Sequence, residues 1–383
     1  MELRHCKLAK VGRYLLEILS VCALLCTTGL AMALEMQALD DAELAEVTGQ
    51  ALFVSDRIAP TGAAGSATDF TFYRMGLDVE LLLNANIDKL QLGCGGFNES
   101  IAGNACDIDF DFVRFMGRNG TSAGNPVTSD FKLLRPYIEL AVRNDGSASL
   151  REIAGIKIGA QAADGFVGVG RRYSTSGSPV NQENGGNCSG TSGTAALNCH
   201  SGINRISGYL NTELSGQFPV SIPLLGTQTA CFGNVTFNAD CNTPYFVEIT
   251  GSRLNQIRVP GVPLTLSAGF LSAIGIDQAY ATIEQSLRFI HGFALEDTDD
   301  FYLSFQREQV AYPTYDKSGY AVTANAGWWM NVPQVKVVDF TGATVSLPIA
   351  DALEALGSPG PVVANSELNQ TPPLNCFGSA MFC

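Results

Sequence analysis

The sequence predicts a mainly β protein in which long antiparallel hairpins form a sandwich-like or elongated sheet, with a short N-terminal helix and local disulfides. Two observations lead to this expectation. Apolar and polar residues alternate with a period of two over several long stretches, which is typical of strands with one solvated face. Eight of the eleven cysteines lie beyond residue 33 in four neighbouring couples, which favours short-range bridges in an exported chain.

Residues 1–33 have the layout of a secretory signal peptide. Basic residues precede an apolar run from Leu15 to Leu30, and the small-residue triplet Ala31-Met32-Ala33 follows it. The run is too short and too interrupted for a permanent membrane span, and the triplet marks a cleavage site. We therefore expect a mature chain that begins at Leu34 and works in the periplasm, at the outer-membrane surface or outside the cell.

Residues 34–50 hold the clearest helical pattern in the chain. Asp40 is a candidate N-cap, and Glu43 stands where a capping box requires its acid. A helix of about two turns is marginal alone in water. We therefore expect its apolar face, with Leu44 and Val47, to dock on the body of the protein or on a partner.

Residues 51–173 form the first predicted β region. Apolar and polar residues alternate from Leu77 to Asp88 and again from Asp107 to Phe112, so these segments predict a hairpin around a cysteine-bridged loop. A second hairpin is expected at Asn144-Asp145-Gly146, between apolar positions that include Ile138 and Leu140 before the turn and Ile156 and Ile158 after it.

Three further segments complete the expected organisation. Residues 174–205 are rich in Ser, Gly and Asn and predict an exposed disulfide loop or a boundary, because structureless loops of this length are unusual inside a domain. Residues 206–356 form the second β region, in which a strand from Leu287 to Leu295 turns at an acidic cluster and returns through Phe301–Phe305. Residues 357–383 form a disulfide-pinned tail.

Short helices are expected at Pro348–Leu356, which Gly357 closes, and around Leu266–Ile274.

The cysteine couples predict four local disulfides. Each would close a loop of about ten residues and contribute on the order of 2–3 kcal/mol by restricting the unfolded chain. The couples are Cys94 with Cys106, Cys188 with Cys199, Cys231 with Cys241, and Cys376 with Cys383.

Composition and histidine content argue against several functions. The chain carries 37 acidic and 23 basic residues, a net charge of −14, so nucleic acid is not an expected partner. Beyond the leader the histidines are His200, expected in a flexible loop, and His291, expected half-buried on a strand. Neither accompanies a nucleophile motif, so we expect no catalytic residue, although a carbohydrate-active enzyme remains an alternative.

Two acidic places are candidate cation sites. Asp297, Asp299 and Asp300 crowd the predicted turn and are calcium candidates, because calcium prefers several oxygen ligands. An ordinary turn is the simpler interpretation. Asp107, Asp109 and Asp111 share one strand face, for which a solvated surface is the simpler interpretation. No other cofactor is expected.

One tryptophan pair has a simple structural implication. Trp328 and Trp329 are adjacent, so on a strand their rings point to opposite faces.

The N-terminal segment carries a resemblance. Leu39-Asp40-Asp41 through Leu44, Val47 and Gly49-Gln50, directly after a secretory signal, resembles the start of a group of exported proteins of Gram-negative bacteria. In that group an L-D-D-x-x-L-x-x-V-x-G-Q stretch precedes long alternating strands, and some members are labelled pilus or filament-system components. Phe301–Gln306 and Gly327-Trp328-Trp329 also look like later parts of such proteins. The resemblance implies a place in a filament-like assembly.

These observations lead to one functional expectation and two alternatives. We expect a non-enzymatic protein of the cell envelope or surface, a structural or adhesive component of an extracellular pilus-like or filament-like assembly with other envelope or filament subunits as partners. The first alternative is a periplasmic protein that binds a hydrophobic ligand such as a lipid. The second is an outer-membrane β-barrel, although the Pro-rich, cysteine-pinned tail stands where a membrane strand is expected.

Overall fold

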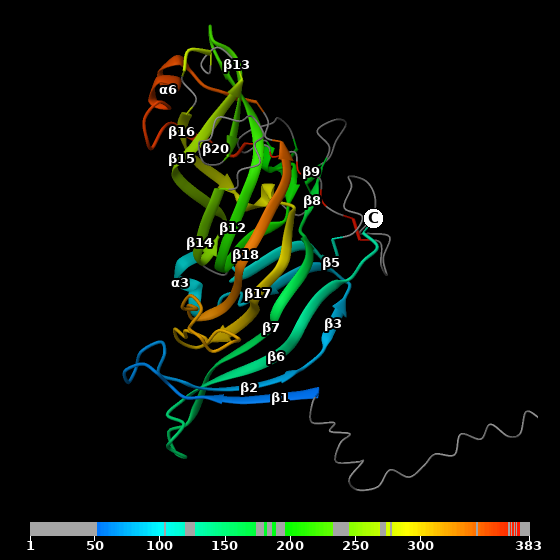
Figure 1. The fold of residues 1–383 in the computed structure, drawn as a ribbon, viewed down its shortest axis with the longest axis vertical. Helices are drawn as coiled ribbons and strands as arrows, with labels where there is room; N and C mark the ends of the chain where they lie inside the picture. The colour runs from blue at the N-terminus through cyan, green and yellow to red at the C-terminus, as the bar shows by residue number, and fades with distance from the viewer. Residues whose placement is uncertain are drawn as a thin grey trace, which may run out of the picture. The chain divides into compact units, whose positions relative to one another are not determined.

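The described part of the chain is mainly β, which confirms the predicted fold class (Figure 1). The predicted signal peptide and the predicted helix with Leu44 and Val47 lie outside the described residues. The computed structural model describes residues 52–102, 105–118, 127–173, 180–181, 186–188, 196–232, 245–268, 273–275, 278–341, 344–366 and the single positions 368, 370, 372, 374 and 375.

One sheet contains most of the strands. Its path runs β1-β2-β6-β7-β17-β18-β12-β13-β15-β16-β20, so strands from both predicted β regions join it. The strands along this path are β1 (Phe53–Ile58), β2 (Thr71–Leu77), β6 (Phe131–Arg143), β7 (Glu152–Gly168), β17 (Gly292–Gln306), β18 (Gly327–Thr341), β12 (Ile203–Ile222), β13 (Gly226–Phe232), β15 (Gln256–Ala268), β16 (Gln278–Ser286) and β20 (Val362–Ala364).

Five further strands attach beside this path. They are β3 (Glu80–Leu83), β4 (Ala85–Leu92), β5 (Ile108–Met116), β14 (Tyr245–Leu254) and β19 (Val345–Ser346). The hairpin predicted around the first cysteine loop is confirmed as β4 with β5, but its expected first strand from Leu77 to Asp88 is not continuous, because Leu77 ends β2 and Glu80–Leu83 form β3, which pairs with β6. The hairpin predicted after Arg143 is β6 with β7. Most pairs are antiparallel as expected, but β18 and β19 run parallel to β12, and β20 runs parallel to β16.

Strand β5 closes part of the sheet on itself. It pairs with β7 at one end and with β12 at the other, so β5, β7, β17, β18 and β12 form a closed circuit of paired strands. The main core cluster contains buried residues from these strands, among them Ile108, Ala163, Ile206, Leu295 and Val335. Burying such side chains contributes roughly 1.5–3 kcal/mol for each large aliphatic residue.

Short elements connect the strands. The helix predicted at Pro348–Leu356 is confirmed as α6 (Ile349–Glu354), but the one predicted around Leu266 is wrong there, because Leu266 continues β15. The others are α3 (Glu99–Ala102), the 3₁₀ turns η2 (Gly96–Asn98) and η3 (Leu287–Phe289), and the short strands β8 (Arg171–Arg172), β9 (Val180–Asn181), β10 (Gly186–Asn187) and β11 (His200–Ser201).

The segment 307–326 covers one side of the sheet formed by β2, β6, β7 and β17. It is held by the bridge between Val310 and Ala324, and its Tyr312 is fully buried in a second core cluster with Phe72 and Trp329. As expected, Trp329 is buried while Trp328, on the other side of β18, is only half-buried. This side of the sheet is therefore already occupied.

The acidic stretch before Phe301 is not the predicted turn, because β17 continues through it. Pairing with β7 shifts between Leu295 and Thr298, which marks a β-bulge, and Asp297 and Asp300 adopt φ values of 48° and 52°. A bulge inserts an extra residue without ending the strand, and Asp tolerates this left-handed backbone better than most residues.

Two of the predicted disulfides are confirmed. Cys94 is bonded to Cys106, and Cys188 is bonded to Cys199. Cys231 is also disulfide-bonded. Residues 241, 376 and 383 lie outside the described residues, so the partner of Cys231 and the last bridge stay predictions.

Candidate functional site: an apolar sheet face

Neighbouring antiparallel strands present large apolar side chains to solvent. Met75 of β2 lies opposite Ile138 of β6, which lies opposite Ile158 of β7. These residues are 55%, 44% and 55% exposed. Directly opposite residues share one side of a sheet, so the three form a continuous row. We define the apolar sheet face as the exposed set Phe53, Met75, Leu77, Ile138, Ile156 and Ile158.

A second row beside the first leads to aromatic side chains. Ile156 lies opposite Leu140 on one side and Phe305 on the other, and Phe305 lies opposite Trp328. The Phe305 ring centroid is 5.4 Å from that of Trp328 and 6.2 Å from that of Phe97, which stands exposed in the Cys94–Cys106 loop. The apolar sheet face therefore has an aromatic edge beside a disulfide-bridged loop.

Charged side chains occupy the inward side of the same strands. Arg74, Glu139 and Lys157 alternate in sequence with the residues of the apolar face, and each is at most 2% exposed. Arg74 Nε donates to Glu139 Oε2 at 2.7 Å, and Lys157 Nζ lies 3.5 Å from Glu139 Oε1. The usual arrangement of a half-buried sheet is thus reversed here, with isoleucines outside and charges inside.

The buried charges attach the segment 307–326 to the sheet. Lys157 Nζ donates to the Pro313 carbonyl at 3.0 Å and lies 4.6 Å from the centroid of the Tyr302 ring. The Arg74 guanidinium donates to the carbonyls of Thr314 and Tyr315. Burial lowers the pKa of Lys157 to about 8, and the charge of Glu139 opposes this effect. These contacts join the segment 307–326 to the strands behind the apolar face.

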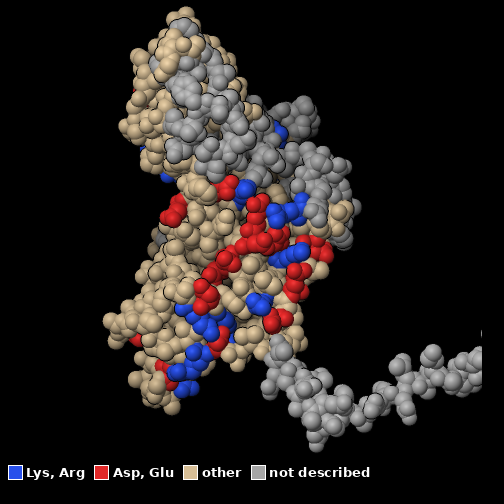
Figure 2. Space-filling model, in the orientation of Figure 1, with Lys and Arg blue, Asp and Glu red and all other residues tan. Residues whose placement is uncertain are grey.

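A polar groove of about 570 Å³ lies at the end of this surface where β6 begins. Arg118 forms ion pairs with Asp164 at 2.7 Å and with Glu296 at 3.1 Å. Figure 2 shows acidic and basic side chains interleaved in a band across the middle of the view. The groove is lined by Glu80, Arg118, Ser129, Asp130, Lys132, Leu134, Ala162, Asp164 and Asp297, so four carboxylates face two cations.

At the opposite end of the surface, beside the β6–β7 hairpin, cations outnumber carboxylates in the ion-pair cluster around Asp145. Arg57 and Arg151 share a single carboxylate, that of Asp145, at 2.7 Å and 3.4 Å. Tyr73 also donates to Asp145 at 2.8 Å. The apolar rows therefore lie between a cationic end and an anionic end.

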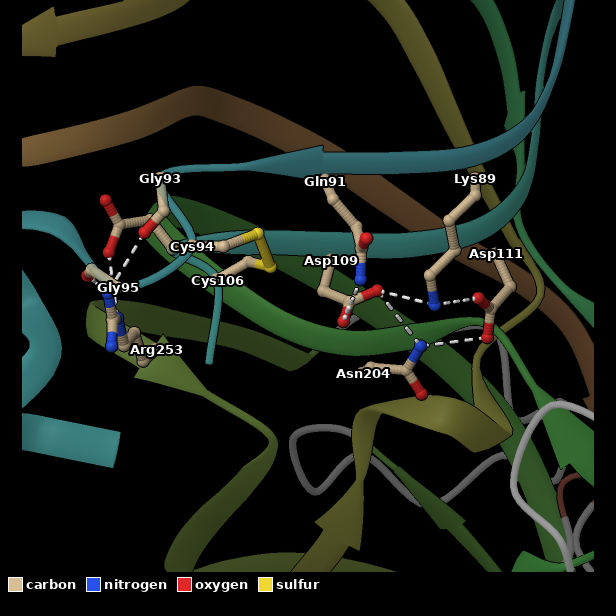
Figure 3. The surroundings of a disulfide bond; sticks show 11 residues. Lys89, Gln91, Gly93, Cys94, Gly95, Cys106, Asp109, Asp111, Asn204 and Arg253 are labelled. Carbon is tan, nitrogen blue, oxygen red and sulfur yellow. Dashed lines mark hydrogen bonds and ion pairs between the residues drawn. A yellow bond between two sulfur atoms is a disulfide. The ribbon is translucent and has the colours of Figure 1, made fainter. Parts of the chain in front are cut away.

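The aspartates of the β5 segment form ion pairs instead of a free solvated face (Figure 3). Asp107 is buried and accepts from Arg253 Nε at 2.9 Å. Lys89 lies between Asp109 and Asp111, and Asn204 Nδ2 donates to Asp111 at 2.8 Å. Because Arg253 and Asn204 come from β14 and β12, these carboxylates join distant parts of the sheet. The expectation of a solvated face is wrong for Asp107 and Asp111.

The two histidines beyond the leader meet inside the protein. His200 and His291 are both fully buried, and His200 Nδ1 lies 2.7 Å from His291 Nε2 in a hydrogen bond. The expectations of a flexible loop for His200 and of half-burial for His291 are wrong, because β11 pairs with β8 and the Cys188–Cys199 bridge anchors the adjacent position. This hydrogen bond joins β11 to the residue that precedes β17.

The calcium candidates Asp297 and Asp300 lie in different surroundings. Asp297 lines the polar groove, whereas Asp300 is partly buried and accepts from the Tyr315 backbone amide at 2.6 Å. Burial raises the pKa of Asp300. Within the described residues, no group of three or more His, Cys, Asp or Glu side chains is arranged to hold a metal ion. A calcium site at Asp297, Asp299 and Asp300 stays a prediction.

Comparisons with known proteins do not place the chain in a family. No protein-family model, curated protein or solved structure matches the chain. Among the described residues, no helix is long and apolar enough to span a membrane. The interpretation of the site therefore depends on its own geometry.

Proposed function

We propose that this protein is an exported, non-enzymatic component of an extracellular assembly of the cell envelope, and that it joins the assembly through the apolar sheet face. The resemblance of its N-terminal segment to exported filament-system proteins supports the kind of assembly. The pairing of His200 with His291 inside the protein supports a role other than catalysis.

The observation that carries the proposal is the reversed arrangement of β2, β6 and β7. Ile138 and Ile158 are about half exposed. Their neighbours in the sequence, Glu139 and Lys157, are fully buried. Large contiguous apolar patches on a soluble protein commonly mark interaction sites. Keeping charges inside costs desolvation free energy, so the outward apolar rows are best explained by a second surface that covers them.

The hydrophobic-carrier alternative receives less support from the interior. Two apolar cavities in the core, one lined by Ile206 and Phe293 and one by Ile222 and Leu264, measure only about 20 Å³ and 30 Å³. Each has room for roughly one water molecule, whereas ligand pockets are on the order of 300–1,000 Å³. A lipid would not fit in either of these two cavities, and stoichiometric lipid in the purified protein would favour this alternative.

A display experiment tests the proposal. Cells that produce tagged protein are sheared, and the high-molecular-weight surface fraction is compared with the soluble exported fraction. We expect wild type in the surface fraction and Ile158→Asp in the soluble one, with unchanged thermal melting. Leu224→Asp is the matched control, since Leu224 is 95% exposed at the β12–β13 turn, away from the face. Equal incorporation of both variants contradicts the proposal.

A further inference from the structure

We propose that the partner of the apolar sheet face is a second copy of this chain, packed face to face about a two-fold axis with its strands antiparallel to those of the first copy. The inference rests on the proposed function and specifies the partner. Two observations carry it: the distribution of charge along the face and the size of the face.

The charge distribution is self-complementary. The β6–β7 hairpin end has two cations, Arg57 and Arg151, around the single carboxylate of Asp145. The groove at the start of β6 has four carboxylates against the cations Arg118 and Lys132. A two-fold axis that makes the strands antiparallel places the hairpin end of each copy over the groove end of the other. Opposite charges then meet at both ends, and the uncharged rows meet in the centre.

The contact surface is large enough for a weak, specific dimer. From β1 to β17 the face crosses four strand spacings of ~4.8 Å, and from Leu140 to Lys132 it extends eight residues of ~3.4 Å. This gives about 500 Å² on each copy, or about 1,000 Å² in total, near the lower limit for specific interfaces. We therefore expect a dissociation constant in the micromolar range.

The sheet geometry also suits this arrangement. Sheets pack face to face at about 10 Å with strand directions within roughly 30° of each other, provided that apolar side chains from both sides interdigitate. Ile138 and Ile158 provide such side chains close to the middle of the face. The segment 307–326 covers only the opposite side, so it does not obstruct the approach of a second copy.

Sedimentation velocity of the oxidised exported protein from about 1 to 200 μM tests the inference. We expect a concentration-dependent dimer for wild type and for Leu224→Asp, and at least tenfold weaker association for Ile158→Asp. Met75→Ser is a milder second variant that weakens association if Ile158→Asp does not fold. A wild-type monomer at 200 μM, or a lipid-bound monomer in native mass spectrometry, overturns the inference.

A charge swap tests the orientation. Arg151→Glu is expected to weaken the dimer at least threefold, and adding Glu80→Lys is expected to restore it, because both side chains are about half exposed and face opposite ends. No restoration contradicts the antiparallel two-fold arrangement.

The two proposals can fail separately. If wild type is monomeric but Ile158→Asp still loses surface incorporation, the face binds a different partner and the proposed function stands. If Ile158→Asp loses dimerisation but incorporates normally, the dimer stands and the proposed function is wrong.

Discussion

Replacement of Glu139 by Gln is expected to destabilise the protein strongly, because Glu139 is the shared counter-ion of two buried cations. Its carboxylate is fully buried, 2.7 Å from Arg74 Nε and 3.5 Å from Lys157 Nζ. Glutamine keeps the shape and removes the charge. Both cations then remain in a region that water does not reach.

Removing one partner of a buried ion pair typically costs about 3–5 kcal/mol. For a chain of this size that corresponds to a melting temperature lower by about 4–7 °C at pH 7. Adding Lys157→Met is expected to recover part of this loss, because one uncompensated cation disappears.

The loss of stability in Glu139→Gln is also expected to depend on pH. Burial lowers the pKa of Lys157 to about 8, below its unfolded value of 10.5, so the folded state binds fewer protons between these values. Stability therefore gains a favourable contribution as pH rises from about 8 towards 10.5. Removing Glu139 takes away an interaction that raises this pKa. The difference in stability between wild type and Glu139→Gln should thus be largest at low pH, should shrink as pH rises towards 8, and above pH 8 should retain only the part due to Arg74.

Thermal melting by circular dichroism at pH 7 and pH 9 measures both effects. Glu80→Gln is the matched control, since Glu80 is 51% exposed and lies 3.8 Å from Lys132, so its loss should cost well under about 1 kcal/mol. A melting temperature of Glu139→Gln within 1 °C of wild type at pH 7 would refute the reasoning.

Three further predictions concern other parts of the chain. Non-reducing peptide mapping should return Cys231 with Cys241 and Cys376 with Cys383 beside the two bridges already seen, whereas a crosslink between distant couples would contradict local pairing. N-terminal sequencing of the exported protein should begin at Leu34, and a start at Gln50 or Ala51 would show a second leader. Asp107→Asn should destabilise the fold by about 3 kcal/mol in chemical denaturation, because it leaves the fully buried Arg253 without its 2.9 Å counter-ion, and an unchanged midpoint would exclude this role.

Local signals in the sequence predicted the local structure well. Alternation and the cysteine couple predicted the β4–β5 hairpin, and adjacency placed Trp328 and Trp329 on opposite sides of one strand. Contacts between distant segments could not be predicted in this way. The His200–His291 hydrogen bond depends on β8, β11 and the approach of residues 91 positions apart, and no local pattern specifies such a register. The bulge in β17 was mistaken for a turn because acidic residues favour both.

The apolar sheet face shows what alternation alone leaves open. A period of two in Ile156-Lys157-Ile158 and Ile138-Glu139-Leu140 says that one side of each strand is apolar, and burial of that side is the ordinary outcome. In the folded chain the apolar side is outward, because Arg74, Glu139 and Lys157 satisfy one another inward and attach the segment 307–326. A strand that slipped by one residue would bury the isoleucines but would expose the charges and release that segment. The outward isoleucines are therefore a fixed consequence of the buried charges, and covering them requires a surface beyond this part of the chain.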